Sequence, residues 1–113
     1  MTPKHERSEQ QFTTLQVPAA FADIDIPWYG GGLDIASDTT MTVSYLSFVA
    51  PPPEQLHTWW IEALEDAGWT IEHSSVSGNG RLDAIVVRPD GRRGLMTIRP
   101  EGSLWWVILT VDP

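Results

Sequence analysis

The sequence predicts an α+β fold: one strand, one amphipathic helix and then a four-stranded antiparallel meander, with the helix packed on one face of the sheet. Three observations lead to this class. An apolar stripe with helical spacing lies between residues 53 and 67. Four short apolar runs follow it and are separated by turn-forming residues at hairpin spacing. A run of alternating polarity precedes it.

The composition fits one globular domain. The chain has 113 residues, of which 42% are hydrophobic and 19% are charged, as is usual for folded domains. We assign residues 1–16 to a polar N-terminal arm and residues 17–113 to a single α+β domain. The absence of cysteine excludes disulfides, thiolate metal sites and cysteine nucleophiles.

The net charge of −8 disfavours nucleic acids and anionic membranes as partners. No stretch approaches the ~18 apolar residues that a membrane span needs, so we expect no direct membrane insertion. Residues 1–16 lack the apolar segment of a signal peptide. If Met1 is the native start, we expect a cytoplasmic protein. If the chain is a trimmed mature form, the alternative is the bacterial periplasm or cell envelope.

Residues 17–35 are predicted to form a loop with apolar anchors. Prolines and the Gly30–Gly32 run interrupt any regular element. Trp28 and Tyr29, however, are too apolar for a free loop. We therefore expect the segment Phe21–Tyr29 to lie against the domain and to cover part of it.

The first strand is predicted at Met41–Val49. Apolar Met41, Val43 and Tyr45 alternate there with polar residues, which is the period of a strand with one buried face. This strand leads directly into the helix.

The helix is predicted to begin near Pro53 and to stop at Gly68, since proline suits a first turn and glycine suits the left-handed residue that ends a helix. Its apolar stripe consists of Leu56, Trp59, Trp60, Ala63, Leu64 and Ala67. The adjacent tryptophans Trp59 and Trp60 are therefore both predicted to belong to the core.

The meander is predicted to contain the strands Trp69–Ser75, Arg81–Arg88, Gly94–Arg99 and Leu104–Val111. Successive side chains on a strand point to opposite faces, so Trp105 and Trp106 cannot both face the helix. We expect Phe21–Tyr29 to cover part of the face away from the helix, and a partner to contact the rest.

The order of these motifs resembles a group of small bacterial envelope-associated α+β modules. Those modules carry a turn of the form P-x-Y-P-G-A, then a strand, then a helix that ends in Gly-Trp. Here Trp60, Leu64 and Gly68–Trp69 match the helix pattern, whereas Gly30 and Gly32 replace the proline and alanine of the turn. The likeness covers residues 26–111 and implies the fold and an envelope association, but no catalytic residues.

Candidate chemistry is sparse. The Gly30–Gly32 run lacks the Lys-Ser/Thr ending of a phosphate loop. Aspartates near it lack the full pattern of a calcium loop. His73 and Ser74 are neighbours on one strand and point to opposite faces, so they make a poor nucleophile–base pair. We therefore expect no enzyme, no cofactor and no metal site.

The functional prediction is a non-catalytic protein-interaction module, an accessory subunit of a larger assembly that binds another, unidentified protein. Its predicted partner-binding residues are Trp28, Tyr29, Arg92, Arg93 and Trp105. The two arginines lie in a turn and can grip an acidic partner. A homo-oligomer is left open. The alternative is a small-ligand-binding domain or an enzyme, with a pocket between the Trp28/Tyr29 loop and the sheet.

Overall fold

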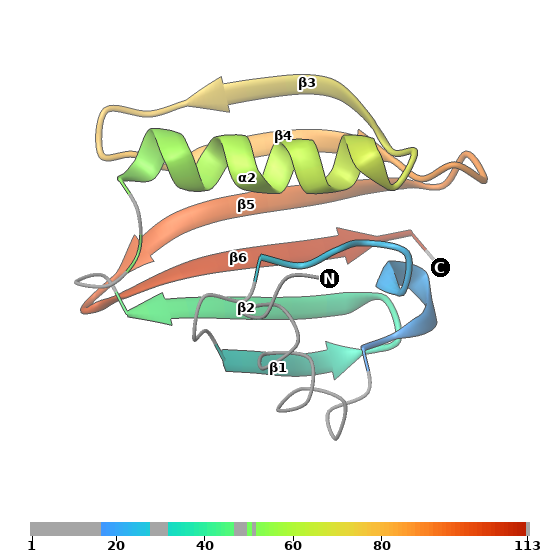
Figure 1. The fold of residues 1–113 in the computed structure, drawn as a ribbon, viewed down its shortest axis with the longest axis horizontal. Helices are drawn as coiled ribbons and strands as arrows, with labels where there is room; N and C mark the ends of the chain where they lie inside the picture. Colours follow the sequence, from blue (N-terminus) through green and yellow to red (C-terminus); the bar gives the residue numbers. More distant parts are fainter. Residues whose placement is uncertain (1–16, 28–31, 47–49, 51, 113) are drawn as a thin grey trace, which may run out of the picture.

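A computed structural model describes residues 17–27, 32–46, 50 and 52–112 and confirms the α+β class. Within these residues there are one α-helix, one short 3₁₀ helix and a six-stranded antiparallel sheet with the order β1-β2-β6-β5-β4-β3 (Figure 1). The elements are η1 (Ala19–Phe21), β1 (Gly32–Ser37), β2 (Thr40–Leu46), α2 (Pro53–Asp66), β3 (Thr70–Val76), β4 (Leu82–Val87), β5 (Arg93–Glu101) and β6 (Leu104–Val111).

The helix α2 begins and ends where the sequence predicts. Pro53 occupies the first turn, and Glu54 follows beside the positive end of the helix dipole. At the other end Gly68 takes a φ of 88°, and the Trp69 N–H donates to the Leu64 carbonyl at 2.9 Å. This six-to-one hydrogen bond satisfies a terminal carbonyl and turns the chain into β3.

The apolar stripe of α2 forms much of the core. Leu56, Trp60 and Leu64 are fully buried, which confirms the prediction for Trp60. Trp59 packs against the core but stays half-buried. His57, which the stripe does not include, is also buried.

The four strands of the meander are confirmed as β3 to β6, and the strand before the helix is confirmed as β2. Residues 47–49 of that predicted strand lie outside the described residues. The predicted number of five strands is wrong, because Gly32–Ser37 forms a sixth strand, β1, paired with β2. The Gly30–Gly32 run suggested a loop and hid the short alternation of Leu33 and Ile35 that follows it.

The register of the strands decides which side chains share a face. Tyr45 on β2 pairs with Trp105 on β6. The Nε1–H of Trp60 on α2 donates to the Tyr45 hydroxyl at 2.9 Å, so Tyr45 and Trp105 lie on the helix side. Burial raises the pKa of Tyr45, and its hydroxyl also contacts the carbonyl oxygen of Pro27. Trp106, one residue along β6, lies on the opposite face.

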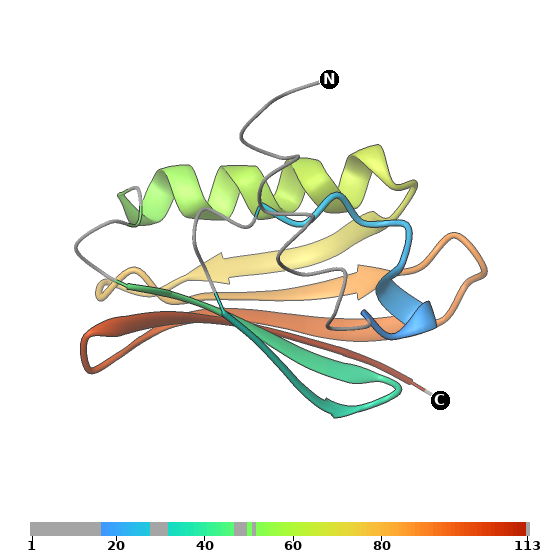
Figure 2. The ribbon, with the colours of Figure 1, turned by 60° about the horizontal axis from the view of Figure 1, so that its bottom comes forward.

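Residues 17–27 pack on the same side of the sheet as α2 (Figure 2). Phe21 stacks on Trp69 with ring centroids 6.4 Å apart, and Arg88 donates a hydrogen bond to the carbonyl oxygen of Ala20. For Phe21–Pro27, the described part of the predicted segment, this confirms that it lies against the domain. The prediction that it covers the face away from the helix is wrong for these residues.

The width of the sheet explains this placement. A helix is ~10 Å wide, whereas six strands at ~4.8 Å spacing span about 24 Å. The helix therefore covers only the half of the sheet that contains β3 to β5, and residues 17–27 run over β6 and β2 (Figure 1). The buried side chains of Met41, Val43 and Leu109 on those two strands need this second cover.

Candidate protein-interaction surface

The face of the sheet opposite α2 and residues 17–27, here called the open face, carries no helix or loop among the described residues (Figure 2). Leu46, Ile85 and Leu95 are exposed on it by 44%, 38% and 48%. Trp106 and Ile108 are half-buried there. Large exposed apolar patches mark contact surfaces, and this set makes the open face the candidate for one.

The apolar side chains of the open face form two clusters. Ile85 and Leu95 are directly opposite each other on β4 and β5. Leu46 is opposite Leu104, two residues from Trp106, at the other end of the sheet. Between the clusters runs a row of paired residues across four strands, namely Asp83, Thr97, Ile108 and Thr42.

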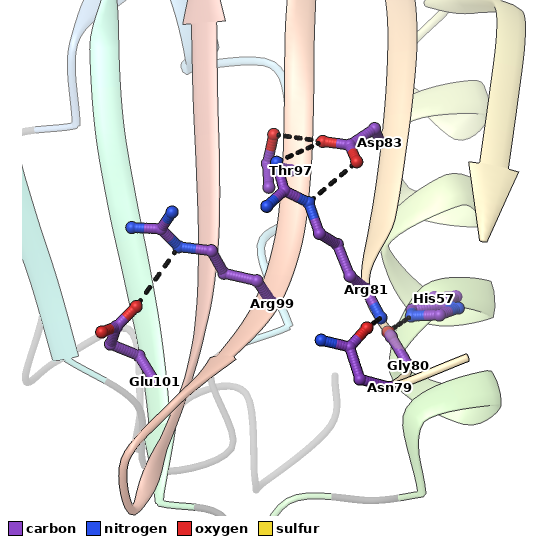
Figure 3. Close-up of polar contacts among 8 residues, drawn as sticks. All are labelled: His57, Asn79, Gly80, Arg81, Asp83, Thr97, Arg99 and Glu101. Atoms are coloured by element: carbon purple, nitrogen blue, oxygen red, sulfur yellow. Dashed lines mark hydrogen bonds and ion pairs between the residues drawn. The ribbon is translucent and has the colours of Figure 1, made fainter. Parts of the chain in front are cut away.

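A polar network holds the middle of the open face (Figure 3). The Arg81 guanidinium reaches the Asp83 carboxylate twice, with Nε–Oδ2 at 2.9 Å and Nη2–Oδ1 at 3.2 Å. The Thr97 hydroxyl donates to Asp83 Oδ1 at 3.0 Å. Hydrogen bonding from Arg81 lowers the pKa of Asp83, although partial burial opposes this. The carboxylate is therefore ionised at neutral pH and held in place from two strands.

Arg99 lies against the tryptophan of the second apolar cluster. Its guanidinium carbon lies 5.5 Å from the ring centroid of Trp106, the residue paired with it across β5 and β6. Its Nε is 3.5 Å from Glu101 Oε2 and has no hydrogen-bond partner within the described ranges (Figure 3). Arginine and tryptophan in contact are frequent among the residues that dominate binding energy at interfaces.

The structure places the predicted arginines next to acids of the same chain. Arg92 Nε lies 3.1 Å from Asp90 Oδ2 in the β4–β5 turn. Arg93, at the edge of the open face, lies 2.9 Å from Glu72 on β3. A backbone hydrogen bond from Arg92 lowers the pKa of Asp90. Both arginines thus already have acidic partners within the chain. This reduces the binding energy that an acidic protein could obtain by contacting them.

Trp105 does not lie on the open face. It is half-buried on the helix side, where its ring packs beside Gly80 and the core. Trp106 is the tryptophan that faces away from the helix, so we transfer the predicted partner-binding role to it. The alternation of side chains along a strand shows that the two rings lie on opposite faces of the sheet. Only the pairing of Trp105 with Tyr45 and of Trp106 with Ser44 shows which ring lies on the helix side.

Trp28 and Tyr29 lie outside the described residues, and so does the pocket predicted between their loop and the sheet. A different cleft of about 530 Å³ lies between the first turns of α2 and the β3–β4 turn. Its lining includes Glu54, His57 and Asn79. His57 Nε2 lies 2.7 Å from the Gly80 carbonyl oxygen, so this ring atom is engaged in a structural hydrogen bond rather than turned toward a ligand.

Within residues 17–27, 32–46, 50 and 52–112, no three histidine or carboxylate side chains come together as metal ligands would. None of the helices in these ranges is long and apolar enough to cross a membrane. Fold and surface together define a small α+β domain with one sheet face that no described helix or loop covers. No family model, curated protein or solved structure matches the chain, so the resemblance to envelope modules stays a prediction.

Proposed function

We propose that the chain is a non-catalytic protein-interaction module that binds protein through the open face of its sheet, as an accessory subunit of a larger assembly. The observation that supports this is the set of apolar side chains on that face, Leu46, Ile85, Leu95 and Trp106, which no described helix or loop covers. The chain has no cysteine, so the same surface would serve in a reducing cytoplasm or an oxidising envelope.

The size of the apolar set is suited to a reversible contact. Full burial of a large apolar side chain contributes roughly 1.5–3 kcal/mol, and Leu46, Ile85 and Leu95 are already about half-buried. Each therefore has roughly 1 kcal/mol left to gain. Trp106 with Arg99 above it is the candidate for the strongest single contribution.

The charges of the open face favour a partner of mixed charge. Arg81 with Asp83 and Arg99 with Glu101 form two pairs of opposite charge on this face. A uniformly acidic partner would be repelled by the carboxylates as much as attracted by the guanidinium groups. Binding through Arg92 and Arg93 stays a prediction, with a smaller expected contribution than the sequence suggested.

The test is affinity capture from the native source with three baits. Leu95→Glu places a charge in the Ile85–Leu95 cluster of the open face, whereas Val76→Glu places the same charge on the helix side, at a residue that is 63% exposed. We expect a protein captured by the wild type to be retained by Val76→Glu and lost by Leu95→Glu. Equal capture by all three baits would rule out the open face as the contact.

The alternative is a small-ligand-binding domain or an enzyme that uses the predicted pocket near Trp28 and Tyr29. Ligand binding there would change the signals of residues near Pro27, which contacts Tyr45. Chemical-shift mapping with a fragment library separates the two functions. Shifts confined to the surroundings of Pro27 would favour the ligand site, and shifts at Leu95 and Trp106 would favour the open face.

A further inference from the structure

Charge is divided unevenly between the two sides of the domain. The open face carries the three arginines Arg81, Arg93 and Arg99 against the five acids Asp34, Glu72, Asp83, Glu101 and Asp112, which is a net charge of −2. The rest of the described chain carries two arginines against eight acids, a net of −6. The charges of residues 1–16 cancel. Most of the excess charge of −8 thus lies away from the open face.

We propose that the open face binds a second copy of this chain, so that two sheets pack face to face about a two-fold axis with the helices outside. This inference rests on the proposed function, because it takes the open face to be a protein-binding surface. It names the partner of that surface as the chain itself.

The distribution of charge supports this partner. Two copies of an acidic protein repel each other wherever their acidic surfaces meet. The open face has a net charge of only −2 and carries both signs, as in the pairs Arg81–Asp83 and Arg99–Glu101. A two-fold rotation brings the same patch of both copies together, so each arginine can lie beside an acid of the other copy.

The area of the open face is sufficient for a weak specific dimer. Six strands at ~4.8 Å spacing span about 24 Å, and strands of six to nine residues are roughly 20–30 Å long. The face therefore measures roughly 600 Å² per copy, and two copies bury roughly 1,200 Å². This lies at the lower end of the range for specific interfaces, so we expect a reversible dimer that depends on concentration.

The polar network limits the cost of burying charge between the sheets. Removing a lone charge from water is costly, whereas a charge that keeps its partner and hydrogen bonds loses less. Asp83 already accepts hydrogen bonds from Arg81 and Thr97, and Glu72 is paired with Arg93. The two apolar clusters on either side of this network supply the favourable free energy of binding, because sheets that pack face to face bury and interdigitate such side chains.

Sedimentation velocity over a series of protein concentrations tests the dimer. We expect the weight-average sedimentation coefficient of the wild type to rise from the monomer toward the dimer value as concentration increases. Leu95→Glu should stay monomeric, and the matched control Val76→Glu should behave as the wild type does. Circular dichroism verifies that both variants are folded. A wild type that remains monomeric at every concentration overturns the proposal.

Salt gives a second, independent readout. Screening weakens the repulsion between two copies that each carry a net charge of −8, so moderate salt should strengthen self-association if the apolar clusters supply most of the binding energy. Contact between a basic patch and an acidic partner would instead weaken with salt. Self-association that falls as salt rises would show that attraction between opposite charges, rather than the apolar clusters, holds the copies together, which would contradict this interface.

The geometry of the dimer can be measured because the chain has no cysteine of its own. A spin label on Thr42→Cys lies on the open face, and one on Thr58→Cys lies on the exposed side of α2. We expect a shorter distance between the two labels of a dimer for Thr42→Cys than for Thr58→Cys. The reverse order would contradict packing through the open face.

The outcomes separate this inference from the proposed function. If the wild type is monomeric and Leu95→Glu alone loses a captured protein that Val76→Glu retains, the dimer is wrong and the open face still binds protein. If Leu95→Glu changes neither self-association nor capture, both fail.

Discussion

His57 Nε2 lies 2.7 Å from the carbonyl oxygen of Gly80. A carbonyl oxygen can only accept, so this nitrogen carries the proton. The bond joins the first turns of α2 to the β3–β4 turn (Figure 3). It therefore holds this end of the helix against the sheet. Trp105 reaches the same place from β6, where its ring lies against Gly80.

Replacing His57 by alanine should destabilise the protein by about 1–3 kcal/mol, the usual loss when a buried hydrogen-bond partner is removed. The Gly80 carbonyl oxygen would lose its side-chain donor. Urea unfolding at neutral pH measures the change. His73→Ala, at an exposed position on β3, is the control and should change stability by less than about 0.5 kcal/mol. Equal effects of both substitutions would show that the bond to Gly80 adds nothing.

Gly80→Ala should be more damaging than Gly91→Ala, although both glycines have a φ near +90°. The left-handed strain of roughly 1–2 kcal/mol is common to both substitutions. A Cβ on Gly80 would also lie 2.9 Å from the Trp105 ring and 3.2 Å from Pro53, whereas a Cβ on Gly91 meets nothing within 4 Å. Overpacking should add roughly 1–3 kcal/mol at Gly80, measured by chemical denaturation. Similar losses at both positions would mean that the turn shifts away from Trp105 freely.

Trp60→Ala should cost about 3–5 kcal/mol, as expected for truncation of a large buried aromatic side chain. It also removes the donor to the Tyr45 hydroxyl. Trp59→Ala should cost less, since this neighbouring ring is only half-buried. Thermal and urea unfolding compare the two variants. A larger loss for Trp59 would contradict the orientation of α2.

Local periodicity predicted the parts of the fold that depend on one segment alone. The stripe around Trp60 and Leu64 specifies a helix, and the turn at Gly91 specifies a hairpin, wherever the rest of the chain lies. Strand β1 was missed because a short edge strand with exposed side chains has few apolar positions to reveal its period. Backbone pairing with β2 stabilises this strand, and that pairing cannot be seen in the local sequence pattern.

The candidate site was harder to predict because it depends on which face each element covers. The divergence of Trp105 and Trp106 follows from strand geometry, but assigning Trp106 to the open face requires the register between β2 and β6. Phe21 was expected on that face, yet it stacks on Trp69 beside the helix. No local pattern shows that α2 alone is too narrow to cover six strands.

Asp83→Asn should lower stability at neutral pH, and its disadvantage should shrink in acid. Hydrogen bonding from Arg81 lowers the pKa of Asp83 below its ordinary value of 3.8. A carboxylate whose pKa is lower in the folded state contributes stability above its unfolded pKa, and this contribution is lost as pH falls through the folded value. The wild type and Asp83→Asn should therefore differ most above about pH 4 and converge below it.

Urea unfolding over a series of pH values measures this convergence. The effect is small because Arg81 and Asp83 are 42% and 36% exposed, and solvent screens such pairs. Glu62→Gln is the charge-matched control, since it removes one negative charge from an exposed position on α2. It should leave stability at neutral pH within about 0.5 kcal/mol of the wild type. A gap between the wild type and Asp83→Asn that stays constant from neutral pH into acid would mean that the packing of Asp83, rather than its charge, stabilises the centre of the open face.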